Sequence, residues 1–303
     1  MADITPDPIM RLATGFMAAK HLFVASEIGV FENLANGPAT LDELAAKSGI
    51  PRRTLRISAD AMVSLGLLER EGDRYRNSAV AAAYLAGRAG PDLRPAIRLL
   101  DRIGYPTWMK LEDAVRRGEG ERHFGRFTEE EQQIFSAGVE AITAGMAALL
   151  AESYDFSRHR RVLDVGGGTG SFLIAVLRRH PTLIRRCRQR FSSCRAPAPL
   201  PAVALQPEGE GTRVAVVEGD LFKDPLPDGH DAIIVANTAH VPLGGQHCGV
   251  IEEHAQSCGG RRTAAARRLV DGFDPHPAAR CTNNVGRVSA HVGRGADLFR
   301  RRR

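Results

Sequence analysis

The segment that most restricts the fold of this chain is RRVLDVGGGTGSFLIAVLRRHP, at residues 160–181. It has the pattern of an apolar strand, a glycine-rich turn and an amphipathic helix, which is the first half of a nucleotide-binding βαβ unit. Glycines in such a turn let the backbone pass close to a ligand, and the N-terminal end of the following helix offers amide donors to it. The segment therefore predicts an α/β Rossmann-like domain with a ligand at the carboxyl end of this strand.

The order of the glycines indicates which ligand the turn suits. A dinucleotide site has the spacing G-x-G-x-x-G, and counted from Gly166 the third of these positions is Ser171. The pattern here is D-x-G-x-G-x-G, and it begins at Asp164. A carboxylate in that position suits a cofactor with a cationic sulfonium and an amino group better than one with a pyrophosphate. On the turn alone, another nucleotide-binding α/β enzyme remains an open alternative.

Two later strands supply more candidate site residues, within RVAVVEGDLFKDPLPDGHDAIIVANTAH at residues 213–240. Asp220 follows the first strand and can accept from an adenine amino group, while Leu221 and Phe222 can cover the faces of the ring. The second strand, at 232–235, is followed by Asn237 and His240. Reactive groups collect beyond the carboxyl ends of strands in open α/β sheets. His240 is thus a candidate reactive residue, or otherwise a surface histidine at a strand end.

The N-terminal region has the pattern of a winged helix. Apolar spacing over residues 9–35 predicts one or two helices, and Thr40 with Glu43 marks the start of another. A second helix is expected over 53–67 and a hairpin over 67–78. Such a unit either binds DNA or mediates dimerisation; the second helix offers Arg52, Arg53 and Arg56 but few other donors for base edges. Further helix is expected over 91–153, broken near 104–106 and around 118–125.

Taken together, the winged-helix-like start, VLDVGGGTG, VVEGDLF and DAIIVANTAH resemble the plant-type small-molecule O-methyltransferases and their bacterial antibiotic-pathway relatives, which include the hydroxyindole O-methyltransferases. The resemblance covers residues 8–182 and 208–241. It implies transfer of a methyl group from S-adenosylmethionine to a hydroxyl of an aromatic small molecule in secondary metabolism. It also implies that the N-terminal domains pair as a homodimer, which favours dimerisation over DNA binding for the winged unit.

The resemblance also assigns roles to residues. His240, in an Asn-x-x-His context, corresponds to the general base of the family. Phe135 and Met146 correspond to acceptor-pocket positions, although aromatic and Met side chains at helical spacing often only pack in a core. The expected cofactor-binding residues are Asp164, Gly166, Gly167, Gly168, Asp220, Leu221, Phe222 and Asn237. The expected domains are 1–100 for dimerisation, 101–155 as a helical linker with the acceptor pocket, and 156–303 for catalysis.

Composition restricts the location and the partners. The net charge of +6 lies entirely in residues 241–303, which hold 11 Arg against five acidic residues. The five cysteines, none of them before residue 187, show neither a Cys-x-x-Cys pair nor zinc-finger spacing, so no metal site is expected. The start of the chain has acidic residues and no secretion signal, and no run approaches the about 18 apolar residues of a membrane span. A cytoplasmic enzyme with no nucleic-acid or membrane partner is expected.

Two segments depart from the family pattern, near 184–206 and 242–303. The first has no carboxylate to hold the ribose hydroxyls, and the second lacks the apolar strand that the family has after the catalytic histidine. If the codons for Phe191 to Arg195 are read two bases out of frame, they can encode Phe-Glu-Leu-Pro, which contains the missing carboxylate. If the codons for residues 260–271 are read one base out of frame, they can encode the missing apolar strand. We therefore expect frameshifted segments. If the segments are genuine, the alternatives are an inactive methyltransferase-like dimer or a winged-helix DNA-binding regulator.

Overall fold

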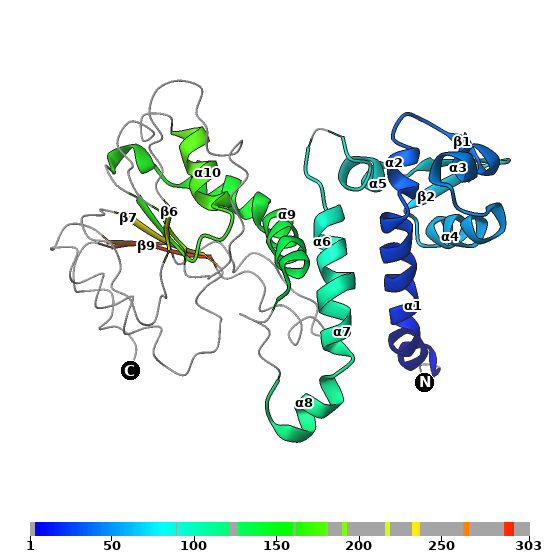
Figure 1. Cartoon of the computed structure of the whole chain (residues 1–303), viewed down its shortest axis with the longest axis horizontal. Coiled ribbons are helices and arrows are strands. Elements are labelled where there is room, and N and C mark those ends of the chain that lie inside the picture. Colours follow the sequence, from blue (N-terminus) through cyan, green and yellow to red (C-terminus); the bar gives the residue numbers. More distant parts are fainter. Residues whose placement is uncertain are drawn as a thin grey trace. The chain divides into compact units, whose positions relative to one another are not determined.

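The computed structural model describes residues 4–88, 90–120, 127–159 and 162–180, together with strands at 190–192, 216–218, 232–236, 263–266 and 288–293. The chain divides into two units (Figure 1). Unit 1 comprises residues 1–123 and 128–142, and unit 2 comprises residues 124–127 and 143–303. Each unit has its own buried cluster of apolar side chains, and each is described by itself below.

Unit 1 contains the predicted winged helix. Its strands form one antiparallel sheet in the order β1-β3-β2, so the hairpin of β2 and β3 is the wing. The elements are α1 (Asp7–Glu27), α2 (Val30–Asn33), β1 (Ala39–Thr40), α3 (Leu41–Ser48), α4 (Arg52–Ser64), β2 (Leu68–Glu71), β3 (Arg74–Asn77) and α5 (Ala79–Tyr84). The helices and the hairpin expected from the sequence are confirmed.

Local chemistry sets the ends of these elements. Thr40 and Glu43 form a capping box, because the Glu43 amide donates to the Thr40 hydroxyl and the Thr40 amide donates to the Glu43 carboxylate, at 3.2 and 2.7 Å. Helix α4 ends at Ser64, before the predicted Leu67, since Gly66 adopts a φ of 72° that ends a right-handed helix.

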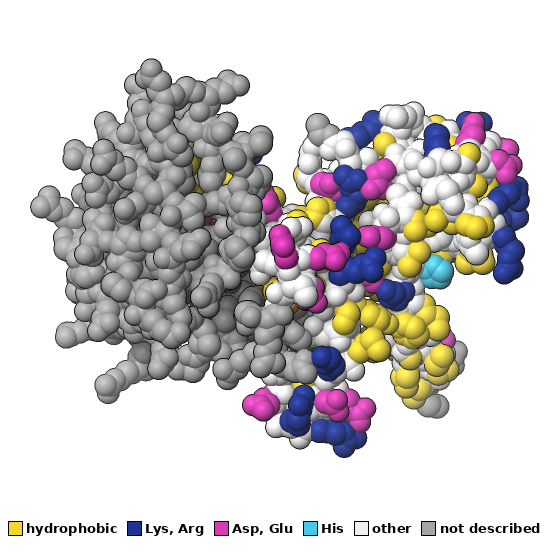
Figure 2. All heavy atoms as spheres, in the orientation of Figure 1, with side chains coloured by type: hydrophobic (Ala, Val, Ile, Leu, Met, Phe, Trp, Pro, Cys, Tyr) yellow, Lys and Arg dark blue, Asp and Glu magenta, His cyan; other side chains and the backbone are white. Residues whose placement is uncertain are grey.

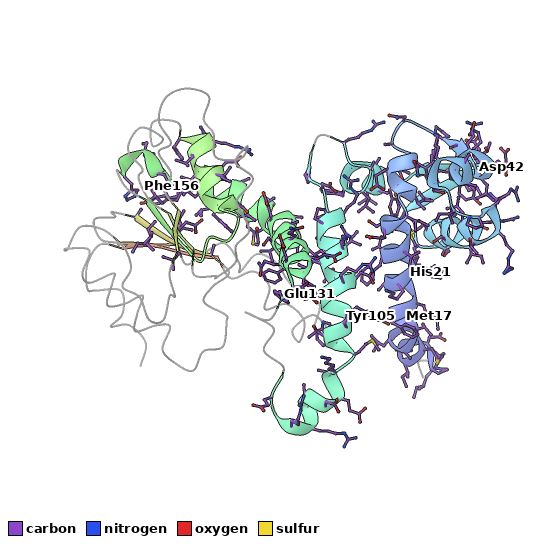
Figure 3. The ribbon with its side chains drawn as sticks, viewed as in Figure 1. Met17, His21, Asp42, Tyr105, Glu131 and Phe156 are labelled. Carbon is purple, nitrogen blue, oxygen red and sulfur yellow. The ribbon has the colours of Figure 1, made fainter. Side chains whose placement is uncertain are left out.

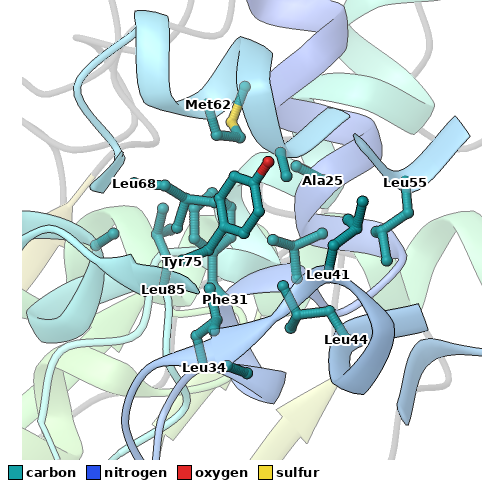
Figure 4. Packing of buried hydrophobic residues seen from close by; sticks show 14 of the residues in the cluster. Ala25, Phe31, Leu34, Leu41, Leu44, Leu55, Met62, Leu68, Tyr75 and Leu85 are labelled. Carbon is teal, nitrogen blue, oxygen red and sulfur yellow. The ribbon is translucent and has the colours of Figure 1, made fainter. Parts of the chain in front are cut away.

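The core of unit 1 lies between α1, α2, α3, α4 and the wing (Figure 4). Tyr75 of β3 is its largest fully buried side chain, packed among Phe31, Met62 and Leu68. Its hydroxyl donates to a carboxylate oxygen of Asp60 at 2.6 Å, so the one polar atom of the ring is satisfied. This hydrogen bond lowers the pKa of Asp60, and burial together with the same contact raises the pKa of Tyr75.

Unit 1 continues with α6 (Arg94–Leu99), a π-helical turn η1 (Leu100–Gly104), α7 (Tyr105–Trp108) and α8 (Leu111–Arg117). The break predicted near 104–106 is wrong, because the chain stays helical there through the wider turn. Pro106 has no amide hydrogen and its ring would clash with the carbonyl four residues earlier; a π turn, in which Tyr105 donates to Leu100 five residues back, accommodates it.

The last two turns of α1 attach to this helical segment. Lys20 forms an ion pair with Asp101, and its ammonium group lies 5.5 Å from the ring centre of Phe23 and 5.1 Å from that of Tyr105. The two rings meet edge to face at 6.4 Å. These contacts fix the C-terminal half of α1 to η1 and α7.

Helix α9 (Glu129–Ser153) begins in unit 1 and ends in unit 2. A capping box of Thr128 and Glu131 starts it. In unit 1, Gly138 lies against the side chain of Leu99, so closely that a methyl group would not fit. Within the described part of the chain α9 is the one helix long and apolar enough to cross a membrane by length and composition alone, a test that core helices of soluble proteins also pass.

Unit 2 contains the expected parallel strands. β4 (Val162–Val165) pairs in parallel with β7 (Ala232–Ala236), and β5 (Arg190–Ser192) pairs in parallel with β6 (Val216–Glu218). Helix α10 (Ser171–Arg179) follows β4, and Phe156 in the 3₁₀ turn η2 (Phe156–Arg158) packs beneath it. This is the strand, turn and helix that the glycine-rich segment predicts.

The sequence predicted no further sheet strand after residue 241, and the structure corrects this. β8 (Thr263–Ala266) and β9 (Val288–Gly293) extend the sheet in the order β4-β7-β9-β8. β9 is antiparallel to both of its neighbours. The backbone N–H and C=O groups at the edge of β7 pair with those of β9, and almost any sequence can make such hydrogen bonds. The apolar pattern of the sequence therefore did not reveal these strands.

Candidate functional site

The candidate site starts at the carboxyl end of β4. Every residue of β4 is buried, and Asp164 is 0% exposed although it is a carboxylate. The chain then turns through Gly166 and Gly168, whose φ values of 67° and 51° lie in the left-handed region that side chains disfavour. The sequence expectation that glycines are required in this turn has a geometric basis.

Gly167 is required for a different reason. A Cβ added to Gly167 would lie 2.5 Å from Oδ2 and 2.7 Å from Cγ of Asp164, closer than real atoms approach. The turn therefore folds directly over the carboxylate, and only a residue without a side chain fits. The structure brings Asp164 and Gly167, two of the predicted cofactor residues, into contact.

The turn leads into α10, and the backbone amide groups of the first turn of this helix face a possible ligand site. The N-cap is Gly170, which provides no side-chain hydrogen bond, and the first turn of any helix holds amide donors that the helix itself does not use. Gly170 N donates to Gly167 O at 2.6 Å, which closes the turn. A buried carboxylate beside a helix N-terminus suits a ligand that carries both a carboxylate and cationic groups, and these features fit the amino-acid part of S-adenosylmethionine.

The other predicted residues follow the neighbouring strands. In the parallel pairing, Asp164 lies opposite Ile234 and Val165 opposite Val235, so β7 ends beside the glycine turn. Asn237 and His240 come after β7, and Asp220, Leu221 and Phe222 come after β6; all five lie outside the described residues. Their roles stay predictions.

The two predicted acceptor residues both lie on α9. Phe135 belongs to unit 1 and Met146 to unit 2, and each is partly buried. Met146 packs against the buried cluster of unit 2, so at least part of its role is to support the core. A contribution to an acceptor pocket stays a prediction for both.

A cluster of histidine and aromatic side chains packs the C-terminal end of α9 beside α10 within unit 2. His180, just after α10, has its Nε2 3.1 Å from the carbonyl oxygen of Ala151 on α9. The Tyr154 hydroxyl is 2.8 Å from Nε2 of His159, and Phe156, labelled in Figure 3, lies edge-on to His180 at 6.0 Å. No motif marks these residues because they meet only after folding.

Most of the arginines on the winged helix of unit 1 lie beside carboxylates (Figure 2). Five arginines of α4 and the wing have carboxylate partners within 3.6 Å: Arg52 with Asp42, Arg56 and Arg70 with Asp60, Arg74 with Glu43, and Arg76 with Glu69. Arg53 of α4 is exposed and forms no ion pair among the described residues. Docking on a phosphate backbone needs a positive face whose charge is not already neutralised. The arrangement does not favour DNA binding.

Comparison with known proteins agrees with the geometry. Residues 10–87 match the O-methyltransferase dimerisation domain and residues 108–251 match the O-methyltransferase domain. The 3-hydroxy-5-methyl-1-naphthoate 3-O-methyltransferase of Streptomyces sahachiroi is 35% identical over 241 residues, which cover 78% of this chain and 69% of the relative. The tetracenomycin polyketide synthesis 8-O-methyl transferase of Streptomyces glaucescens is 32% identical, with coverage of 78% and 70%.

The fold is likewise shared with a solved enzyme. The crystal structure of human N-acetylserotonin methyltransferase in complex with S-adenosylmethionine superposes with a TM-score of 0.69 at 27% identity, and covers 85% of this chain and 78% of that one. The expected Rossmann-like domain, helical dimerisation domain and cofactor are confirmed. The chain belongs to the family of S-adenosylmethionine-dependent O-methyltransferases that act on aromatic small molecules.

Proposed function

We propose that this protein methylates a hydroxyl of an aromatic small molecule in a secondary-metabolic pathway such as antibiotic biosynthesis, as a cytoplasmic homodimer. The observation that carries the proposal is the glycine turn folded over the fully buried Asp164 at the carboxyl end of β4. The relatives support the substrate class, since those of Streptomyces act on a naphthoate and in the synthesis of a polyketide.

The roles of the residues follow from their places along the sheet. Asp164 and the amides at the start of α10 hold the amino-acid part of the cofactor, while Asp220, Leu221 and Phe222 hold its adenine and Asn237 helps to orient it. S-adenosylmethionine supplies a methyl group on a sulfonium, which is an activated leaving group. The protein's main task is alignment, worth several kcal/mol when the attack is in line.

His240 removes the acceptor's proton. A phenol has a pKa near 10 and is a poor nucleophile at neutral pH. A neutral imidazole within hydrogen-bond reach takes the proton as the oxygen attacks, a contribution of about 10²- to 10⁴-fold to the rate. Phe135 and Met146 of α9 contribute to the apolar wall on which the aromatic ring lies.

The two departing segments are part of the same proposal. We infer that residues near 184–206 and 242–303 are frameshifted, and that a chain with both segments in frame regains a ribose carboxylate. Sequencing the gene tests this directly: codons that do not encode Phe-Glu-Leu-Pro and the apolar strand in the shifted frames would refute it. The chain as printed is expected to bind S-adenosylmethionine weakly, and calorimetry that finds tight binding would contradict that expectation.

The activity test uses the frame-restored enzyme with labelled S-adenosylmethionine and a panel of phenolic, indolic and quinone acceptors. We expect methyl transfer to at least one hydroxylated aromatic, and a rate loss of about 10²- to 10⁴-fold in His240→Ala. His21→Ala, a change of a partly buried histidine on α1, is the matched control and should keep the full rate. Wild-type activity in His240→Ala would remove this histidine from the mechanism.

The competing regulator hypothesis predicts salt-sensitive DNA affinity. The ion pairs of the arginines on α4 and the wing argue against it. An electrophoretic shift with random-sequence duplex at low salt is expected to show no complex at micromolar protein.

A further inference from the structure

His180 joins the C-terminal end of α10 to the C-terminal end of α9. It is the C-cap residue of α10, and its Nε2 lies 3.1 Å from the carbonyl oxygen of Ala151, in the last turn of α9. A carbonyl oxygen can only accept, so Nε2 carries the hydrogen and donates. The last four carbonyls of a helix have no amide partner within that helix, and Ala151 is 3% exposed. His180 therefore supplies a donor where water has little access.

The His180 ring is held in place by an aromatic cluster around η2, the turn that connects α9 to β4. Phe156 lies at its centre, 1% exposed, and its ring centre is 4.7 Å from that of Tyr154 and 6.0 Å from that of His180, edge to face in both cases. The His159 ring stacks on Tyr154 at 5.7 Å, and its Nε2 is 2.8 Å from the Tyr154 hydroxyl. Close packing of these rings restricts rotation of the His180 imidazole, so the direction in which it donates is fixed.

Apolar packing alone does not fix the position of α9 along α10. One buried cluster contains side chains of both helices: Ala147, Leu150 and Ala151 of α9, and Phe172, Leu173, Val176 and Leu177 of α10. Hydrophobic attraction is non-directional, and the two alanines present no bulky group that would resist a slide of one helix along the other. A hydrogen bond, in contrast, weakens steeply when its angle or length changes. The bond from His180 to Ala151 therefore fixes the register that the apolar contacts leave open.

The two helices carry different parts of the candidate site. The first turn of α10, which offers its amides beside the glycine turn, begins at Ser171, about 13 Å along the helix axis from His180. Met146, predicted to line the acceptor pocket, lies on α9 about 7 Å along the axis from Ala151, and both residues belong to unit 2. A shift of α9 along its axis would thus move Met146 and leave the amides that face the cofactor in place.

We propose that His180 is a positioning residue for methyl transfer, because its hydrogen bond to Ala151 sets the place of Met146 relative to the cofactor. This inference rests on the acceptor role proposed above for Met146 and names the contact that maintains it. Reacting atoms must lie about 3–3.5 Å apart and in line, and a misplacement of about 1 Å can lower the rate about 10²-fold. Loss of the bond should therefore impair use of the acceptor and spare binding of the cofactor.

Two substitutions of similar length separate the hydrogen bond from the packing. His180→Gln keeps an N–H donor near the place of Nε2, whereas His180→Met fills a similar space without a donor. In the frame-restored enzyme, assayed with the best acceptor of the phenolic, indolic and quinone panel, His180→Met should lower kcat/KM for the acceptor by about 10- to 100-fold. His180→Gln should restore most of this loss. Both variants should bind S-adenosylhomocysteine within about twofold of wild type in a calorimetric titration.

Hydrogen–deuterium exchange of the chain as printed gives a readout that needs neither cofactor nor acceptor. The amides at the C-terminal end of α9, residues 147–154, should exchange about fivefold faster in His180→Met than in wild type, the effect of one hydrogen bond on local opening. His180→Gln should match wild type, and exchange of β4 should be unchanged in both variants. Arg179→Met, a change of an exposed residue in the last turn of α10, is the control for substitution at this helix end and should alter neither exchange nor kinetics.

Several results would overturn the proposal. Acceptor kinetics of His180→Met close to those of wild type would show that the bond does not position the acceptor. Equal losses in His180→Met and His180→Gln would exclude the hydrogen bond as the cause. A parallel loss of S-adenosylhomocysteine affinity, with faster exchange throughout unit 2, would indicate a general structural role. Absence of methyl transfer by the wild-type enzyme would refute the proposed function instead, and the exchange comparison would still decide whether His180 holds α9.

Discussion

Substitution of Gly167 by alanine tests the idea that the glycine turn must lie directly on Asp164. The new Cβ would be 2.5 Å from Oδ2, against about 3.5–4.0 Å for an ordinary contact, so the carboxylate must move by about 1 Å. Asp164 is fully buried in a strand whose every residue is buried. The φ of Gly167 is not positive, so the penalty is steric and not conformational.

Two quantities should change. Overpacking of this kind costs about 1–3 kcal/mol of folding free energy, which lowers the melting temperature by several degrees. A carboxylate displaced from the cofactor loses a charge-assisted hydrogen bond of about 1.5–3 kcal/mol, which weakens binding by roughly 10- to 100-fold. Thermal unfolding followed by circular dichroism measures the first on the chain as printed. Calorimetric titration with S-adenosylhomocysteine measures the second on the frame-restored enzyme.

Gly145→Ala is the control, because an added Cβ there meets nothing within 4 Å and α9 gains helix propensity. It should leave binding unchanged and raise the free energy of unfolding by about 0.5–1 kcal/mol. If Gly167→Ala binds within twofold of wild type and melts at the same temperature, the close packing of the turn on Asp164 does not determine function.

Two further substitutions test packing in unit 1. Gly138→Ala should lower the free energy of unfolding by about 1–3 kcal/mol in urea, the opposite sign to Gly145→Ala on the same helix, because its Cβ would overlap the Cβ of Leu99. A stabilising Gly138→Ala would contradict this. Tyr75→Phe should lower the free energy of unfolding by about 1 kcal/mol at pH 7, the net value of one hydrogen bond. The loss is no larger because the Asp60 side chain is partly exposed, so water can replace the lost hydroxyl. Since the Tyr75 hydrogen bond lowers the pKa of Asp60, the stability that it provides is complete above the unfolded carboxyl's pKa and is lost as the pH falls through the folded pKa. The difference from wild type should therefore shrink below about pH 4, and a difference independent of pH from 3 to 7 would contradict the assignment.

Much of the fold follows from local sequence patterns. The capping box of Thr40 and Glu43, the hairpin at residues 68–77 and the strand, turn and helix around Gly166 all depend on neighbours within a few residues. Such patterns act through backbone propensity and short-range hydrogen bonds, which the sequence displays directly. They sufficed to predict the fold class, the cofactor and the family.

Three-dimensional geometry decided what these patterns could not reveal. The contact of Gly167 with Asp164, the π turn before Pro106 and the clamp of His180 on Ala151 each need the backbone in its folded place. Charge is the clearest case, because the sequence shows arginines on α4 and the wing, but only the fold brings Asp42 within reach of Arg52 and Glu43 within reach of Arg74. The sequence alone determined that this chain has a nucleotide-type turn and a helical pairing domain. The tertiary structure decided how tightly the turn closes on its carboxylate and where His180 holds the end of α9, because both depend on distances between residues that local patterns do not encode.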